Sequence, residues 1–430
     1  MRCAWGKVIL VLVVVVGVLQ VIHMLLLSRL ELRQSGLRRI DEDGVTAPGG
    51  ASLSSASLHE SWVRDLEAMD AAVGASSVLD PSGEFKVVNF LAHADARASR
   101  HDVTLVSQCS QDRLWQISLL VRRWQGPMAI AVFATGDRLW TAVKTVATLR
   151  QCVPGVRSNV SFHLVHPVGQ AGLKGTAVRV RDAVGSDKCD CSSLVDEQQR
   201  TRTNYAWGDK VVYPNNLLRN VGRRNAATEF VFVVDVDMVP NVDLHDEFLE
   251  FARAQRLFDA NRRDDKTVYV VPAFEAREGT PVPRDKTDLL HLLAQVRVRP
   301  FYFKLCWKCQ GHTDYEAWQR EPPAPQLAVL FEVLWKDPWE PFYIARNNVP
   351  LYDERFKQYG FNRISQVCEL HIAGYKFSIL NNAFLVHWGL KTTDSFHARK
   401  DEDQERNRLL FRQFKTELKD KYPDSSRRCY

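Results

Sequence analysis

Two aspartates one residue apart, Asp235 and Asp237, follow the apolar run 231–234 in the segment EFVFVVDVDMVPN. Alternate side chains of a strand point to the same side, so the two carboxylates are expected to share one face. Two carboxylates held side by side repel each other unless a cation lies between them. Hard oxygen ligands favour Mg²⁺ or Mn²⁺, which can bridge to a diphosphate. The pair therefore predicts a divalent metal site for a phosphorylated ligand, although an isolated D-x-D is more often a turn.

The surrounding sequence alternates between strand and helix patterns. Apolar strands are expected at 102–110, 128–136, 160–168 and 230–240, and a helix is expected over 138–150. This alternation indicates an α/β fold, a Rossmann-like and mostly parallel sheet with helices on both faces. Such sheets bind ligands at the carboxyl ends of their strands, which is where the two aspartates fall.

Composition and charge limit the classes of function. The chain has 430 residues, of which 45% are hydrophobic and 25% charged, enough for one large globular domain or two smaller ones. The net charge of +6 is modest, and the basic residues are scattered among acids. No nucleic-acid partner is therefore expected.

The N-terminal region predicts a membrane anchor. Residues 8–27 carry no formal charge and are long enough to cross a bilayer core of roughly 30 Å. The stretch exceeds the ~7–15 apolar residues of a cleavable signal peptide, so an uncleaved signal anchor is favoured over that alternative. Residues 1–7 would then be a cytoplasmic tail, 28–95 a luminal stem, and 96–430 the catalytic domain.

Two features favour a luminal catalytic domain, although the charges that flank the anchor do not settle its orientation. Asn159 begins an N-glycosylation motif, Asn-Val-Ser. Eight cysteines follow the anchor, at positions 109, 152, 189, 191, 306, 309, 368 and 429. An even number at long spacings is typical of structural disulfides in an oxidising compartment. Cys306 and Cys309 could instead be half of a zinc site or a redox pair, but no second C-x-x-C or nearby histidine pair accompanies them.

Several segments together resemble glycosyltransferase family 49, which includes the second catalytic domain of the LARGE glycosyltransferases. They are YPNNLLRN (213–220), VDVDMVP (234–240), VVPAFE (270–275), VRPFY (298–302), DPWEPFY (337–343), YGFNRISQ (359–366), FLVH (384–387) and RRC (427–429). The resemblance runs from about residue 100 to the end. It implies a GT-A fold in a single-pass type II protein of the Golgi membrane. It also implies Mn²⁺-dependent transfer of glucuronate from UDP-glucuronate, in β-1,4 linkage, to xylose. In the family, this step primes the O-mannosyl glycan of α-dystroglycan for extension by LARGE.

The resemblance also implies that His387, at the end of FLVH, completes the metal site. From the residue alone, a hydrogen-bonded core histidine is the simpler interpretation. The family pattern has a lysine after this histidine, whereas Trp388 stands here. Lys391 is retained and could meet a phosphate as a point charge.

The donor contacts are expected on the segment NNLLRN. Asn216, Arg219 and Asn220 fall on one face if the segment is helical, and an ordinary surface face is the alternative. Arginine pairs bidentately with carboxylates and phosphates, so Arg219 is our first candidate for the glucuronate carboxylate. Arg346 and Arg363 are weaker candidates.

Forming a β-glycoside from an α-linked nucleotide sugar inverts the anomeric centre, which requires a carboxylate base for the acceptor hydroxyl. Many inverting GT-A enzymes carry this acid within a DE-x-F…G segment, but the corresponding position here is Asn362-Arg363. We therefore rank Glu340 first and Asp353 second, although Asp353 could equally be a helix cap. Three aromatic residues in the same segment could stack on sugars or belong to the core: Trp339, Phe342 and Tyr343.

Two other functions stay open. The chain could use another donor, as an N-acetylglucosaminyltransferase or other UDP-sugar transferase does, because donor choice depends on a few contacts. It could also be a catalytically idle luminal partner of a LARGE-type enzyme. The presence of Asp235, Asp237 and His387 argues against idleness.

Overall fold

The computed structural model describes residues 55–75, 77–136, 138–169, 189–194, 212–393 and 399–429, together with residue 20. The predicted tail and all but one residue of the predicted anchor lie outside this part. Among the described residues, no helix is long and apolar enough to cross a membrane. Residues 55–430 form one compact unit, distinct from residues 1–54.

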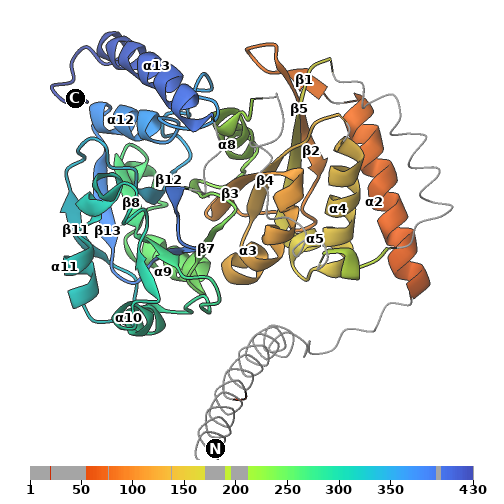
Figure 1. Ribbon diagram of the computed structural model, residues 1–430, viewed down its shortest axis with the longest axis horizontal. Helices are drawn as coiled ribbons and strands as arrows, with labels where there is room; N and C mark the ends of the chain where they lie inside the picture. The colour runs from red at the N-terminus through yellow and green to blue at the C-terminus, as the bar shows by residue number, and fades with distance from the viewer. Residues whose placement is uncertain are drawn as a thin grey trace, which may run out of the picture. The chain divides into compact units, whose positions relative to one another are not determined.

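A ten-stranded sheet forms the centre of this unit (Figure 1). Its strands are β1 (Ser77–Leu79), β2 (Phe85–Ala92), β3 (Val103–Ser110), β4 (Met128–Phe133), β5 (Val160–Pro167), β6 (Phe230–Val233), β8 (Thr267–Val271), β11 (Val329–Val333), β12 (Phe342–Arg346) and β13 (Lys376–Leu380). They lie in the order β1-β2-β5-β4-β3-β6-β12-β8-β13-β11. The four strands expected from the apolar runs are therefore confirmed as β3 to β6, although the last of them is shorter than expected.

The sheet is mixed, so the prediction of a mostly parallel sheet is wrong. Strands β5, β4, β3 and β6 are parallel neighbours, and β8 and β13 form another parallel pair. The other neighbours are antiparallel, including both contacts of β12, which lies between β6 and β8. An antiparallel strand can enter the sheet from the opposite end without a crossover helix, and the sequence pattern does not reveal this.

A second, four-stranded sheet in the order β10-β9-β14-β7 supports the ends of the central sheet. It consists of β7 (Met238–Pro240), β9 (Ala273–Ala276), β10 (Val298–Pro300) and β14 (Leu385–Trp388). Strand β14 pairs with β7 on one side and β9 on the other. In this register His387 lies opposite both Met238 and Glu275.

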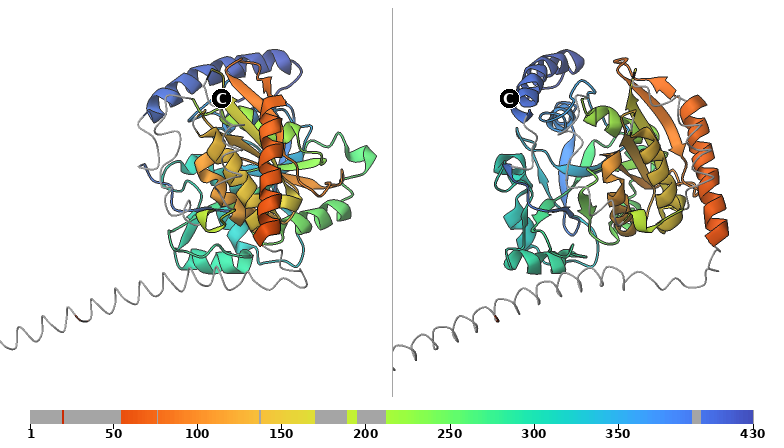
Figure 2. Two further views of the ribbon diagram at one scale, coloured as in Figure 1. Left: turned by 90° about the vertical axis from the view of Figure 1, so that its right-hand side faces the viewer. Right: turned by 45° about the vertical axis from the view of Figure 1, so that its right-hand side comes forward.

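Helices cover both faces of the central sheet, as expected (Figures 1 and 2). The α-helices of the described unit are α2 (Ser55–Ala75), α3 (Ile117–Trp124), α4 (Leu139–Cys152), α5 (Val156–Asn159), α8 (Asn215–Arg224), α9 (Leu244–Ala254), α10 (Lys286–Ala294), α11 (Tyr315–Arg320), α12 (Ile364–Ile372) and α13 (Lys400–Lys421). Alternate residues of β4 show the two faces. Ile130 packs in the core with α2, α3 and α4, whereas Ala131 packs with α8.

The folded unit begins earlier than predicted, because residues 55–95 are not a stem. Helix α2 buries one stripe of side chains and packs on α4, and β2 pairs with β5. The buried stripe consists of Trp62, Leu66, Met69 and Val73. Its spacing is helical, and the indole of Trp62 also donates a hydrogen bond of 3.2 Å to Thr148. The small and polar residues before this stripe obscured the pattern.

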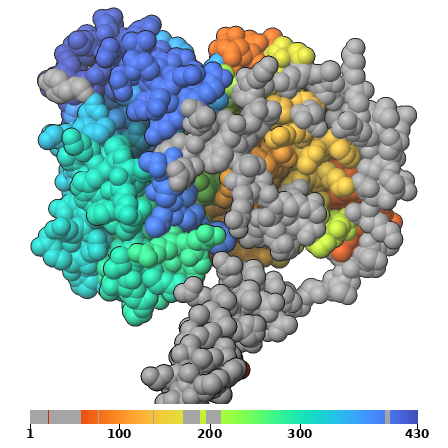
Figure 3. Space-filling model, in the orientation of Figure 1, coloured from red at the N-terminus to blue at the C-terminus, as the bar shows by residue number. Residues whose placement is uncertain are grey.

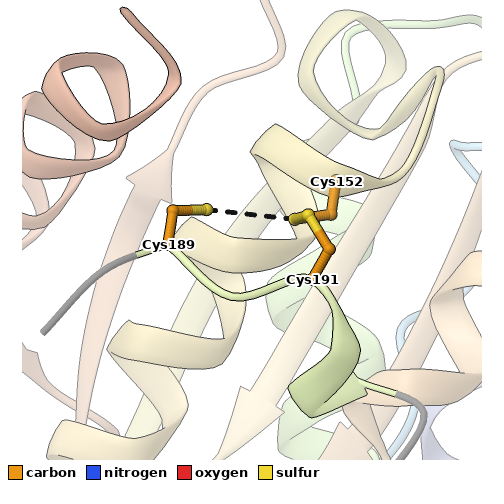
Figure 4. Close-up of side chains that lie close together, drawn as sticks. All are labelled: Cys152, Cys189 and Cys191. Carbon is orange, nitrogen blue, oxygen red and sulfur yellow. Dashed lines mark hydrogen bonds between the residues drawn. A yellow bond between two sulfur atoms is a disulfide. The ribbon is translucent and has the colours of Figure 1, made fainter. Parts of the chain in front are cut away.

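Disulfides close three loops, Cys152–Cys191, Cys306–Cys309 and Cys368–Cys429. The disulfide interpretation is confirmed for these six cysteines, and the zinc alternative for Cys306 and Cys309 is wrong. Cys109 and Cys189 are free thiols. The sulfur of Cys189 lies 3.9 Å from that of Cys152 (Figure 4).

Removing the indole of Trp62 tests whether α2 belongs to the fold. Trp62→Ala deletes a fully buried side chain, so it should lower the free energy of unfolding by about 3–5 kcal/mol. Val78→Ala in the neighbouring β1, where the side chain is 60% exposed, should cost much less. Urea denaturation monitored by circular dichroism measures both. Equal stability of Trp62→Ala and wild type would instead support the prediction that residues 55–75 belong to the stem.

Candidate active site

The two aspartates lie in the turn between β6 and β7 and not within a strand. Strand β6 ends at Val233, and the amide of Met238 closes the turn with a 2.9 Å bond to the carbonyl of Asp235. The expected reason for their proximity, alternation along a strand, is therefore wrong. Both carboxylates are one-third exposed, and they have different partners.

Two arginines hold Asp235. Arg219 on α8 lies 3.0 Å from one carboxylate oxygen, and Arg363, just before α12, lies 2.7 Å from the other. The amide of Gln108, near the end of β3, approaches the first oxygen at 3.4 Å. Burial alone would raise the pKa of Asp235, but Arg363 and Arg219 outweigh it and hold this pKa below its ordinary value.

Asp237 faces a histidine and a lysine. Its Oδ2 lies 3.0 Å from Nε2 of His387 and 3.5 Å from Nζ of Lys391. Burial is again outweighed, here by Lys391 and His387, so the pKa of Asp237 is held well below its usual range. The two aspartates thus differ, since Asp235 is paired with arginines and Asp237 is paired with a possible metal ligand.

The hydrogen bonds of His387 fit a divalent cation. Its Nδ1 lies 2.6 Å from the carbonyl of Gly389, which can only accept, so Nδ1 carries the hydrogen. Nε2, the other ring nitrogen, lies against a carboxylate oxygen of Asp237. That contact is favourable only when a proton or a metal ion lies between the two atoms. A backbone carbonyl that fixes the ring in this way is the usual support of a metal-bound histidine. The donor set of Asp237, His387 and Asp235 therefore suits Mg²⁺ or Mn²⁺.

A buried acid that the sequence analysis missed positions Lys391. Glu275 on β9 is fully buried, and its Oε2 accepts a 3.1 Å hydrogen bond from the amide of Lys391. Arg299 on β10 pairs with its other oxygen. The sequence feature that could have identified Glu275 is an acid in the apolar segment VVPAFE, because an unpaired charge in a buried strand would be costly.

Glu340 reaches the site because β12 is antiparallel to β6. In their register Ile344 lies opposite Phe232, so the start of β12 lies beside the end of β6, near the aspartates. The Glu340 amide donates to the carbonyl of Cys309 at 2.8 Å, and its own carbonyl accepts from Gln310. No described residue forms a hydrogen bond with its carboxylate. The pKa of Glu340 is raised to about 7, because burial and the charge of Asp235 raise it by more than Arg363 and Arg219 lower it.

Asp353, the second candidate base, is engaged elsewhere. Arg355 binds both of its carboxylate oxygens, at 3.0 and 2.6 Å, and also pairs with Glu417. Arg363 occupies the position where an acid was expected and binds Asp235 instead. The geometry therefore favours Glu340 as the base.

The structure corrects most of the expected donor contacts. Asn216 is fully buried, and its amide donates to the carbonyls of Asp353 and Asn362 while its oxygen accepts from Arg219. Arg219 is 3% exposed and holds Asp235 and Asn362, which makes it a structural ion-pair partner and not an open donor site.

The two remaining basic candidates for donor contact, Arg346 and Lys391, differ in their position relative to the site. Arg346 lies at the opposite end of β6, where it pairs with Glu229, so it is wrong as a donor contact. Lys391 is 23% exposed beside Asp237, and it stays a predicted phosphate contact.

The aromatic residues proposed for sugar stacking belong to the core. Trp339, Phe342 and Tyr343 are buried, and the ring of Phe342 lies 3.9 Å beneath the Arg363 guanidinium. The sequence analysis did not identify Tyr302, which lies near Glu340 and both aspartates. Burial raises the pKa of Tyr302, and the charges of these acids raise it further. Its φ of 56° is unusual for a tyrosine, and such strain is often found at functional sites.

The predicted glycosylation site lies at the end of α5. Asn159 is partly exposed, and its amide donates a 3.2 Å hydrogen bond to the carbonyl of Gln125. The hydroxyl of Ser161, the third residue of the motif, accepts from the amide of Ala94. Glycosylation of Asn159 stays a prediction.

Comparison with known proteins gives a consistent result. The family model described as glycosyl-transferase for dystroglycan matches residues 102–423. Beta-1,4-glucuronyltransferase 1 of Danio rerio is 37% identical over 441 residues, covering 100% of this chain and 99% of that protein. The xylosyl- and glucuronyltransferase LARGE2 of Mus musculus is 32% identical over 303 residues, which cover 70% of this chain and 36% of that protein.

Solved structures add little to this comparison. That of S. aureus TarS 1–349 in complex with UDP-GlcNAc covers 76% of this chain and 68% of its own, at 11% identity and a TM-score of 0.37. This score is too low to support an argument. The GT-A assignment therefore stays a prediction, within an observed mixed α/β fold.

The pKa of Glu340 predicts how transfer depends on pH. A base must be ionised, so activity should rise roughly tenfold per pH unit below about 7 and level off above it. Glu340→Gln should lower kcat by at least about a hundredfold and leave no such rise. Asp353→Asn is the matched control and should keep the profile. A Glu340→Gln variant with wild-type kcat would exclude this residue as the base.

Direct Mn²⁺ titration by calorimetry tests the metal ligands without relying on activity. Asp237→Asn should weaken Mn²⁺ binding by at least about tenfold, because it removes the charge beside His387. His387→Ala should weaken it less, since one neutral ligand is lost. Asp246→Asn is the control, an exposed acid that pairs only with His245 among the described residues. Unchanged binding in Asp237→Asn would leave the aspartates as a turn with no metal role.

Proposed function

The chain belongs to glycosyltransferase family 49, the glycosyl-transferases for dystroglycan, and we propose that it transfers glucuronate from UDP-glucuronate to xylose in β-1,4 linkage. The observation that carries this proposal is the pairing of Asp237 with His387, in a chain similar over its whole length to beta-1,4-glucuronyltransferase 1. The acceptor we propose is the xylose-terminated O-mannosyl glycan of α-dystroglycan. The product would be extended by a LARGE-type enzyme.

Each side chain of the site has a role in this reaction. Glu340 takes the proton of the attacking xylose hydroxyl, which suits its pKa of about 7. Attack from the side opposite to UDP inverts the anomeric centre in a single displacement. Lys391 lies where it can bind a phosphate oxygen. A bound Mn²⁺, held by Asp237, His387 and Asp235, would supply Lewis-acid stabilisation of the leaving diphosphate.

The arginines act indirectly. Arg219 and Arg363 fix Asp235. Their positive charges also lower the pKa of Glu340, so the base stays ionised to a lower pH than burial alone would allow. Replacing either would leave one oxygen of the partly buried Asp235 carboxylate without its partner, so both should matter for folding as well as for transfer.

For cellular location, we propose a type II Golgi membrane protein with residues 28–430 in the lumen. The three disulfides support this, because such bonds persist in oxidising compartments. Peptide-N-glycosidase should increase the gel mobility of wild type but not of Asn159→Gln. Protease should leave residues 28–430 intact in sealed microsomes. Digestion of these residues in sealed microsomes would contradict the proposed orientation.

A donor screen tests the function. The purified protein with Mn²⁺ and a β-xyloside should form product with UDP-glucuronate, and at least about tenfold less with UDP-xylose, UDP-glucose or UDP-N-acetylglucosamine. Lys391→Ala should raise the KM for every UDP-sugar, because a phosphate contact is shared by all of them. Preferential transfer of N-acetylglucosamine would support the alternative donor. No transfer from any donor, with Mn²⁺ binding intact, would favour the idle-partner function.

A further inference from the structure

A hollow of about 600 Å³ lies between the segment 307–316, which begins inside the Cys306–Cys309 loop, and the edge strand β11. Neither aspartate of the candidate active site lines it. Its aromatic members are Trp307, Tyr315 and Phe331, and its polar members include His312, Asp314, Glu316 and Glu332. The volume is large enough for one or two sugar rings.

Trp307 provides an open aromatic face in this hollow. The indole is 44% exposed, which is unusual for so large an apolar side chain. One side rests against Gly311, where an added Cβ would stand only 2.9 Å from the ring. Phe303 and Tyr315 flank it, with ring centroids at 5.3 and 5.9 Å. The indole is therefore held in place on one side and available to a ligand on the other.

The polar side chains around the indole mostly accept hydrogen bonds. Asp314, Glu316 and Glu332 carry carboxylates, which accept from hydroxyl groups. Burial lowers the pKa of His312, and Lys336 lowers it further, so this ring is neutral at physiological pH. The carboxylates repel a phosphate or a uronic acid. An aromatic face beside several acceptors thus suits a neutral ligand with one apolar side and many hydroxyls, which describes a neutral pyranose.

The rival occupant is an extended peptide added to the edge of β11. This strand has only five residues, and its pairing with β13 shifts register between Val329 and Phe331. A register shift twists an edge strand and makes it a poor template for a further strand. The geometry therefore favours a sugar over a peptide.

The hollow is connected to the candidate active site through one loop. The Cys306–Cys309 disulfide closes the loop that carries Trp307, and the carbonyl of Cys309 accepts the hydrogen bond from the amide of Glu340. A glycan whose reacting hydroxyl lies at Glu340 therefore meets a stacking surface on the same loop. We propose that this hollow binds a neutral pyranose of the acceptor glycan, one or more sugars away from the xylose that receives glucuronate. This proposal rests on the proposed function for the identity of the acceptor.

Binding without turnover tests the hollow separately from transfer. In saturation-transfer NMR with the full chain and no donor, xylotriose should bind wild type and Trp307→Phe with similar affinity, and Trp307→Ala roughly five- to tenfold more weakly. Leu409→Ala, which truncates an exposed side chain on α13, is the control and should bind normally. Thermal unfolding should show that all variants are folded. Failure of wild type to bind xylotriose, or equal binding by Trp307→Ala, would overturn the proposal.

Steady-state kinetics provide the second measurement. Trp307→Ala should raise the KM for xylotriose by roughly five- to tenfold, and should leave kcat and the KM for a single β-xyloside unchanged. Equal increases for both acceptors would place Trp307 in the transfer centre and overturn the remote site. Strand addition would be favoured if Trp307→Ala kept its affinity for xylotriose but no longer bound an unglycosylated acceptor peptide. Xylotriose binding in a protein that transfers no sugar would leave the hollow supported and the proposed function rejected.

Discussion

The pairing of Asp235 with Arg219 and Arg363 is the interaction on which the rest of the site depends. It joins the turn after β6 and the preceding helix α8 to the segment before α12, which is remote from both in sequence. Removing the Asp235 carboxylate would leave two buried guanidinium groups without a counter-charge, and removing either arginine would leave one carboxylate oxygen without its partner. The same cations lower the pKa of Glu340 from the value that burial alone would give. Before any ligand arrives, the charge of the aspartates is already balanced by protein groups.

The antiparallel insertion of β12 determines which residues meet at this site. A parallel β12 would carry the residues before it to the opposite end of the sheet, far from the turn after β6. The observed register instead brings Glu340 to the end of β6 and sends Arg346 to the other end, where it pairs with Glu229. In Figure 3 the N-terminal half of the unit, in orange and yellow, and the C-terminal half, in teal and blue, are both exposed on one face. The charged groups of the site lie between Arg219 and Lys391 in the sequence.

Local patterns in the sequence predicted local features well. Apolar runs identified β3 to β6, whereas His387, which lies beside Asp237, was expected at the site only from the family resemblance. Roles that depend on distant partners could not be predicted, because Asn216 and Arg219 are occupied by Asp353, Asn362 and Asp235, and no spacing reveals those contacts. The direction of β12 was equally hidden, since an apolar run has no direction. Helix α2 had a readable stripe, but the flanking small residues resembled a linker.

The mixed sheet also has a consequence for biosynthesis. Strand β6 pairs with β3, which precedes it, and with β12, which is synthesised more than a hundred residues later. Until β12 emerges, one edge of the apolar strand FVFV has no partner, and Asp235 lacks Arg363. Unpaired edges of this kind promote aggregation. This edge of β6 therefore stays unpaired until about four fifths of the chain has left the ribosome, and a stop codon before residue 342 would leave a product that cannot complete its central sheet.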